Sequence, residues 1–305
     1  VAPYFGTVEK PDCHMLYNVT TMATTWHTVA TRDIRLLRKQ MDIVCSLPRE
    51  YTFLNYLRCH DDIGWGLDYD TLKSWGMKEV PHKKYLNDYF QGKTEGSVSR
   101  GELYNADPVT GDARFCGTTA SMCGIESAGF EQDEQKMDWA ITKDVMLHAY
   151  MFTQSGIPML YSGDEIGQVN DYTYKDDPEK APDSRYIHRG KFNWDLVENI
   201  KDTSSVQGRI FGALDHLEKI RRSEAVFDAD AQVYTKDYSD QSILWIVRKA
   251  GGEELHAVFN FSDYPKTIWM PETAEYMDLL TGRSDEVTTV NLPGWGFMWM
   301  KRKYN

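Results

Sequence analysis

The sequence has little of what nucleic-acid-binding and membrane proteins require. It contains no run of more than three basic residues, and its formal net charge is −12, which disfavours nucleic acid and anionic membrane surfaces as partners. No apolar stretch approaches the roughly 18 residues that a transmembrane helix needs. The five cysteines are scattered and lack metal-ligand spacing, so we predict no metal site, a reduced compartment and a cytoplasmic location.

Several catalytic signatures are also missing. There is no Gly-x-Gly-x-x-Gly after a strand, no P-loop and no Gly-x-Ser-x-Gly, so dinucleotide, nucleotide and serine-hydrolase chemistry have no support. No signal peptide is visible, and the chain opens Val-Ala-Pro-Tyr-Phe-Gly without an initiator Met. We therefore expect these residues to lie within a longer protein. Aromatic residues are plentiful, at 13%; they suit stacking on sugar rings, but large cores use them too.

The N-terminal region has the pattern strand, helix, strand. Cys13–Tyr17 is a short candidate strand, and Asn18 is a candidate N-cap. Apolar residues then recur every three or four positions from Val19 to Val44, which predicts one helix that ends before Pro48. Thr52–Leu57 is short, apolar and β-prone, and predicts a buried strand. Such a unit is typical of a parallel sheet.

A long excursion with weak periodicity follows over residues 64–132. A structureless loop of this length is improbable in a compact domain, so we expect small helices at 67–75 and 83–90. Residues 133–154 return to helical spacing, and a further strand is predicted at 158–161.

The hydrophobic pattern of the sequence changes from helical spacing to alternation near Ala225. An amphipathic helix is predicted at 207–222, and short alternating runs separated by turn residues come after it. These runs are 232–235, 242–249, 254–261, 266–270, 288–292 and 296–301. They predict an all-β sandwich over residues 225–305, preceded by an α/β domain over residues 1–224.

The polarity inverts abruptly after the strand at 52–57, where His60, Asp61 and Asp62 stand side by side. Catalytic and ligand-binding residues of parallel α/β sheets lie at the carboxyl ends of the strands, so we expect a functional site here. From the residues alone, the alternative is a loop with two solvated aspartates.

The segment Phe-Leu-Asn-Tyr-Leu-Arg-Cys-His-Asp-Asp-Ile-Gly-Trp, residues 53–65, resembles the strand-seven motif of the α-amylase clan, glycoside hydrolase family 13. Its His-Asp-Asp-Ile-Gly-Trp part is most similar to the amylosucrase branch. The resemblance implies that Asp61 is catalytic, because it would favour the oxocarbenium-like transition state. It also implies that His60 binds the same sugar ring and that Asp62 lies toward the neighbouring subsite.

Two later segments carry further parts of the resemblance. Gly156-Ile-Pro-Met-Leu-Tyr-Ser-Gly-Asp-Glu resembles the strand-eight segment. Asp164 and Glu165 there could be read as acid and nucleophile, but the resemblance favours a structural role for both. Residues 107–121 resemble the amylosucrase insertion, which implies that Arg114 faces the fructosyl subsite; the alternative is a surface arginine paired with Asp112.

The third segment, Asp183-Ser-Arg-Tyr-Ile-His-Arg, resembles the loop after strand eight. In the family, one arginine of this loop pairs with an upstream aspartate and closes the pocket. Arg185 takes that role by position, and a guanidinium suits it because its planar fork holds a carboxylate in a fixed geometry. Arg189 is a second basic group nearby. Gly190 stands where the family has a proline, a minor departure.

The fold that the resemblance implies is α/β: the C-terminal part of a (β/α)8 TIM barrel, with strands six to eight and the insertion at about 64–132, followed by the β-sandwich. Retaining glycosidases need a nucleophile and an acid/base about 5 Å apart, and no segment matches either; Glu9 lies in a loop. We therefore expect either a missing N-terminal half of the barrel or self-association to cover the exposed strands. The chain alone is predicted to be inactive.

The implied function is amylosucrase-like: sucrose donates its glucosyl unit to an α-glucan oligosaccharide, fructose leaves, and no cofactor is needed. A sucrose hydrolase or an α-glucosidase or α-amylase-type hydrolase is the alternative among enzymes. Outside the enzymes, the alternative is a carbohydrate-binding module without catalytic activity.

Overall fold

The computed structural model describes residues 2–7 and 9–303. Three short strands form a parallel sheet in the order β1-β2-β6: β1 (Met15–Tyr17), β2 (Thr52–Asn55) and β6 (Ile157–Pro158). Leu16 pairs with Phe53, and Leu54 pairs with Ile157. The predicted parallel arrangement is confirmed, but β2 and β6 end earlier than expected. Whether these strands are six to eight of a barrel stays a prediction.

The predicted helix from Val19 to Val44 is wrong in its continuity. Two helices cover it, α1 (Val19–Thr31) and α2 (Arg35–Cys45). Asn18 is the N-cap of α1, as predicted, and its side chain accepts from the Thr21 N–H. Arg32 ends α1 in the left-handed conformation, with a φ of 60°.

A tertiary contact explains the break after α1. Arg32 donates hydrogen bonds to Asp263 and to the Tyr89 hydroxyl, and the Ile34 N–H bonds to the Gln241 carbonyl at 2.8 Å. These partners lie far along the chain. The apolar spacing continues across the break because both helices bury residues in the same core.

The excursion at 64–132 is well structured. The two predicted small helices are present as α3 (Tyr69–Ser74) and α4 (Glu79–Phe90). A small antiparallel sheet, which the sequence did not predict, pairs β3 (Ile63–Gly64) with β5 (Arg114–Cys116) and β5 with β4 (Glu102–Tyr104). Two further helices follow, α5 (Thr119–Cys123) and α6 (Ile125–Glu131).

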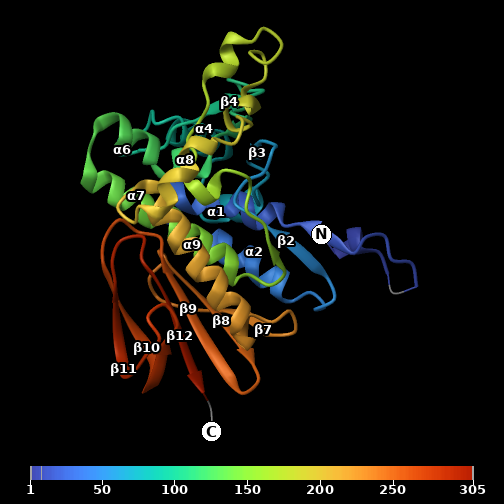
Figure 1. The fold of residues 1–305 in the computed structure, drawn as a ribbon. Helices are drawn as coiled ribbons and strands as arrows, with labels where there is room; N and C mark the ends of the chain where they lie inside the picture. Colours follow the sequence, from blue (N-terminus) through green and yellow to red (C-terminus); the bar gives the residue numbers. More distant parts are fainter. Residues whose placement is uncertain (1, 8, 304–305) are drawn as a thin grey trace.

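The remaining helices are α7 (Glu134–Thr153), the short α8 (Trp194–Val197) and α9 (Val206–Ser223). The two long ones, α7 and α9, pack against each other (Figure 1). Short 3-10 turns, among them η2 (Asp164–Ile166) and η4 (Ser184–His188), lie in the loop that follows β6. No described helix is both long enough and apolar enough to cross a bilayer.

The C-terminal segment forms one six-stranded antiparallel sheet in the order β11-β10-β12-β9-β8-β7. Its strands are β7 (Gln232–Lys236), β8 (Ile243–Ala250), β9 (Glu253–Asn260), β10 (Lys266–Asp278), β11 (Arg283–Leu292) and β12 (Phe297–Lys303). The predicted all-β segment is confirmed, and among the described residues its six strands pair in one continuous sheet. The sandwich arrangement stays a prediction. The register of β10 against β11 shifts between Trp269 and Ala274.

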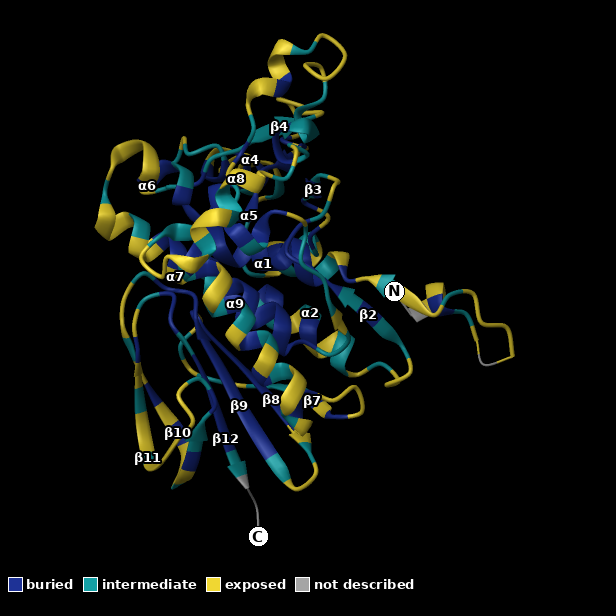
Figure 2. Ribbon diagram, viewed as in Figure 1, coloured by how far each residue is buried: buried dark blue, intermediate teal, exposed yellow. Residues whose placement is uncertain are grey.

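Both faces of this sheet bury apolar side chains, which explains why the alternating pattern resembles that of a sandwich. Leu244 and Phe259 belong to the core that contains the helices. Trp245, Ile268 and Met298 belong to a second buried cluster formed within the sheet region. Figure 2 shows α1 and β9 buried along most of their length, whereas the short α8 is not buried. The change from helices to strands falls between α9 and β7; the domain boundary near Ala225 stays a prediction.

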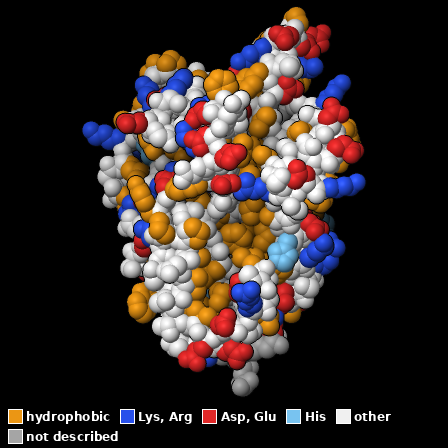
Figure 3. Space-filling model, turned by 60° about the vertical axis from the view of Figure 1, so that its left-hand side comes forward, with side chains coloured by type: hydrophobic (Ala, Val, Ile, Leu, Met, Phe, Trp, Pro, Cys, Tyr) orange, Lys and Arg blue, Asp and Glu red, His pale blue; other side chains and the backbone are white. Residues whose placement is uncertain are grey.

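One face of the molecule is shown in Figure 3. On the face in Figure 3, charges of both signs are interspersed, and hydrophobic side chains gather in a central hollow. No broad basic patch is visible on that face.

Candidate active site

The loop that follows β2 carries His60, Asp61 and Asp62, and the chain then enters β3. The Asp61 side chain is half-exposed, at 53%. Its Oδ1 accepts from the Asp62 N–H at 3.0 Å and from Arg185 Nη1 at 3.1 Å. The structure thus brings together two predicted site residues from distant parts of the chain.

Asp183 orients Arg185. As the N-cap of η4 it accepts the Arg185 N–H at 3.0 Å, and its carboxylate also accepts from Arg185 Nε at 2.9 Å. The guanidinium lies over the Tyr104 ring, with Cζ 4.7 Å from the centroid. Sequence reasoning did not select Asp183 or Tyr104. The cap spacing Asp-x-Arg was a usable signal for Asp183, but Tyr104 comes from the unpredicted β4.

Arg189 holds the backbone of the same loop. Its Nε donates to the His60 carbonyl at 2.5 Å, and its guanidinium lies 3.7 Å from Asp183 and 4.0 Å from Asp61. The His60 side chain itself is exposed. The carbonyl of His60, rather than its imidazole, therefore makes the contacts that fix this loop.

Asp62 pairs with Arg114. Arg114 Nε lies 3.0 Å from Asp62 Oδ1, and the antiparallel pairing of Gly64 with Arg114 brings them together. Asp112 instead binds Lys83 Nζ at 2.5 Å. Arg114 is exposed, as the alternative expected, but its predicted pairing with Asp112 is wrong.

A buried ion pair lies beneath the loop. Arg58 Nη2 lies 2.7 Å from Asp164 Oδ1, and the two side chains are only 1% and 2% exposed. Glu165 accepts from the Gly163 N–H at 2.8 Å. Glu165 thus holds its own loop, whereas Asp164 ties that loop to the segment after β2. Arg58 was missed; its only signal was a charged residue directly after an apolar strand.

The two neighbouring aspartates have pKa values displaced in opposite directions. Burial acts to raise the pKa of Asp61, but the hydrogen bonds from the Asp62 N–H and Arg185 outweigh it, and the pKa is lowered. Burial and the Asp61 charge raise the pKa of Asp62 against the attraction of Arg114. Asp61 is therefore the more firmly ionised carboxylate of the pair.

His188 supports the loop from within. Burial, and next the Arg58 charge, lower the pKa of His188 to about 3. The neutral ring accepts from the Gly117 N–H through Nδ1 at 3.1 Å, and its Nε2 lies 3.4 Å from the His60 carbonyl. In the part of the chain that the structure describes, no three His, Cys, Asp or Glu side chains gather as a candidate metal site.

No model of a protein family matches the chain. It is 23% identical over 300 residues to the glucosylglycerate phosphorylase of Escherichia coli (strain K12), covering 98% of this chain and 50% of that protein. It is 22% identical over 319 residues to the glucosylglycerate phosphorylase of Spirochaeta thermophila, covering 97% and 50%. The chain thus spans about half the length of the curated relatives it matches.

Solved structures match its fold. Sucrose 6F-phosphate phosphorylase from Thermoanaerobacter thermosaccharolyticum has a TM-score of 0.61 and 17% identity, covering 90% of this chain and 47% of that one. AmyP in complex with maltose has a TM-score of 0.62 and 13% identity, covering 97% and 51%. These matches support the predicted resemblance to the α-amylase family.

Within the α-amylase family, the resemblance to the amylosucrase branch stays a prediction. The matched curated relatives are named phosphorylases, whereas the structural neighbours include a phosphorylase and a hydrolase. The roles of Asp61, His60, Asp62, Arg114, Arg185 and Arg189 likewise remain predictions, although the structure places all six around one loop.

Proposed function

We propose that this chain carries part of the glucosyl-binding site of a retaining α-amylase-family enzyme that moves a glucosyl unit from sucrose to an α-glucan and releases fructose. The observation that carries the proposal is the ionised Asp61, held by Arg185 at the carboxyl end of a parallel strand. A carboxylate whose hydrogen bonds to the sugar tighten in an oxocarbenium-like transition state accelerates the reaction.

Accessibility supports this role for Asp61. The side chain is half-exposed while one oxygen is already fixed by Arg185 and the Asp62 N–H. A fixed carboxylate loses little rotational freedom when substrate binds, so more of the binding energy can stabilise the transition state. Asp62, just before β3, and its partner Arg114, on β5, would then border the subsite of the leaving group or acceptor.

We also propose that the three-stranded parallel sheet is covered by a partner. Tyr17, Leu54 and Ile157 are paired across the parallel sheet and therefore share one face. Tyr17 is 50% exposed and Ile157 is 46% exposed. An exposed apolar face on a three-stranded parallel sheet favours a covering partner, either the remaining strands of a barrel or a second copy.

Phosphate as the acceptor is the second candidate. The observations that favour it are the names of the matched relatives and the arginines at the site: Arg114, Arg185 and Arg189 lie around Asp61 and Asp62. Guanidinium groups recognise phosphate in a bidentate manner. In that case inorganic phosphate would take the glucosyl unit and give glucose 1-phosphate.

One assay separates these candidates. The protein as its gene encodes it is incubated with sucrose or with glucosylglycerate, in the presence of glycogen, of phosphate or of neither. Fructose release with glycogen elongation supports the transferase. Glucose 1-phosphate supports the phosphorylase, and free glucose supports a hydrolase. If no donor is consumed although the protein binds glycogen, catalysis is refuted in favour of a binding module.

A further inference from the structure

A second pocket lies away from the Asp61 loop and shares none of its residues. It has a volume of about 370 Å³ and is lined by α6, α7, the end of α1 and the turn after β9. Pockets that bind small molecules start at roughly 300 Å³. Its lining includes Arg32, Cys123, Lys136, Trp139, Lys143 and Asp263.

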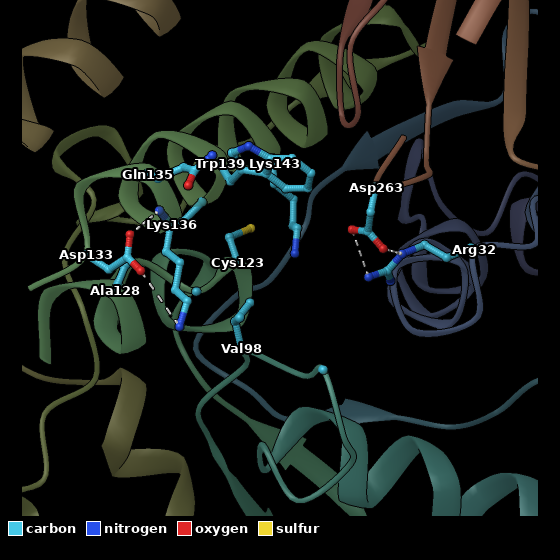
Figure 4. Close-up of a pocket in the computed structure, with 13 residues that line it drawn as sticks. Arg32, Val98, Cys123, Ala128, Asp133, Gln135, Lys136, Trp139, Lys143 and Asp263 are labelled. Atoms are coloured by element: carbon cyan, nitrogen blue, oxygen red, sulfur yellow. Dashed lines mark hydrogen bonds and ion pairs between the residues drawn. The ribbon is translucent and has the colours of Figure 1, made fainter. Parts of the chain in front are cut away.

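Lys143 is an unpaired ammonium in the wall of this pocket. The residue is only 5% exposed, and among the described residues its Nζ has no hydrogen-bond or ion-pair partner; it lies 4.5 Å from the centroid of the Trp295 ring. Figure 4 shows the side chain extending from α7 into the pocket, between Cys123 and Asp263. A buried charge without a partner is costly, so a site of this kind favours an anion.

The carboxylates of the pocket wall have other partners, although the Asp263 charge also acts to raise the pKa of Lys143 against burial. The Asp263 carboxylate is already occupied: Arg32 Nε donates to it at 3.1 Å, and Trp295 Nε1 donates at 2.7 Å. Asp133 lies at the other end beside Lys136, whose Nζ is 3.9 Å from it and also pairs with Glu131. Arg32 adds a second cation, with Cζ 4.6 Å from the same Trp295 ring.

The charge state at neutral pH suits anion binding. Burial, and next the Arg32 charge, lower the pKa of Lys143 to about 8. The amine is therefore still mostly protonated at pH 7. Trp139, which is 47% exposed, provides an aromatic surface for a sugar ring or another flat body.

We propose that this pocket binds a small organic anion, with its phosphate or carboxylate group on Lys143 and its body against Trp139. The proposal does not depend on the function of the Asp61 loop. A pocket of this size accommodates a ligand of the dimensions of a monosaccharide phosphate, and phosphate and carboxylate are both anions that an ammonium recognises.

Calorimetric titration of the protein as its gene encodes it, with glucose 6-phosphate, gluconate and uncharged glucose, tests the proposal. We expect binding of at least one of the two anions and none of glucose at the same concentrations. The preferred anion identifies the head group. Binding of neither anion, or equal binding of glucose, would overturn the proposal.

Variants locate the bound anion. Lys143→Met should weaken binding at least tenfold, whereas Lys219→Met, an exposed lysine of α9 paired with Asp215, should not change it. Arg185→Gln should also leave it unchanged, which separates this pocket from the Asp61 loop. Lys143→Met removes an unpaired buried charge, so the ligand-free variant should melt no lower than the wild type. The anion should raise the melting temperature of the wild type and of the two control variants, but not that of Lys143→Met. Equal affinity in Lys143→Met refutes the site.

Discussion

Arg185 Nη1 lies 3.1 Å from Asp61 Oδ1, although the two residues are 124 positions apart in the chain. Arg185 is at the same time bound to Asp183, two residues before it. The guanidinium therefore links a loop that follows β2 to a loop that follows β6. Substitutions at this link and around it can measure its contribution to turnover and to the stability of the fold.

Asp61→Asn should lower the turnover of the protein as its gene encodes it by about 100-fold or more, because losing one group that stabilises the transition-state charge typically costs that much. Turnover is measured with the donor that the assay above identifies. Asp215→Asn, on the exposed face of α9, is the matched control and should keep full turnover. Comparable turnover in Asp61→Asn and the control would remove Asp61 from the catalytic centre.

Asp164→Asn should destabilise the fold by about 3–5 kcal/mol, since it leaves the buried Arg58 guanidinium without its carboxylate. Chemical denaturation measures the free energy of unfolding. Asp215→Asn breaks an exposed ion pair with Lys219 and should cost no more than about 1 kcal/mol. If both variants lost the same free energy of unfolding, the Arg58–Asp164 pair would contribute no more to stability than an exposed ion pair.

Acid should remove the stabilisation that Arg185 provides. The pKa values of Asp61 and Asp183 are both lowered from the ordinary 3.8 by this guanidinium and by backbone hydrogen bonds, against burial. Carboxylates with depressed folded-state pKa values stabilise the fold above the unfolded pKa and lose that contribution as the pH falls through the folded value. The free-energy difference between wild type and Arg185→Gln should therefore be constant above pH 5 and shrink below about pH 4. A difference that grows toward low pH would contradict the ion pairs.

The 305-residue chain by itself should release no fructose from sucrose, because none of its segments matches the family's nucleophile or acid/base. The preparation is checked by intact mass under denaturing conditions, so that a second polypeptide would be seen. Fructose release by a homogeneous sample, abolished in Asp61→Asn, would show that the chain contains its own nucleophile.

Local features of the chain were predictable where one short segment decides them. The Asn18 cap, the helices α4 and α9, and each strand of the C-terminal sheet follow from spacing and turn residues within a few positions. The break between α1 and α2 was not predictable, because Arg32 is held by Tyr89 and Asp263, which lie far along the chain. The β3-β5-β4 sheet was not predictable, because its short strands pair Ile63 and Leu103 with Phe115, which lies far along the chain from Ile63.

The sequence by itself determined which residues could form the site: the His60–Asp62 segment at a strand end and the arginines Arg114, Arg185 and Arg189. Only the tertiary structure decided their partners. Arg114 pairs with Asp62 rather than Asp112, Arg189 holds the His60 carbonyl, and Arg58 holds Asp164. Residue types and strand ends are local properties, whereas an ion pair between distant loops depends on how the sheets and helices bring those loops together.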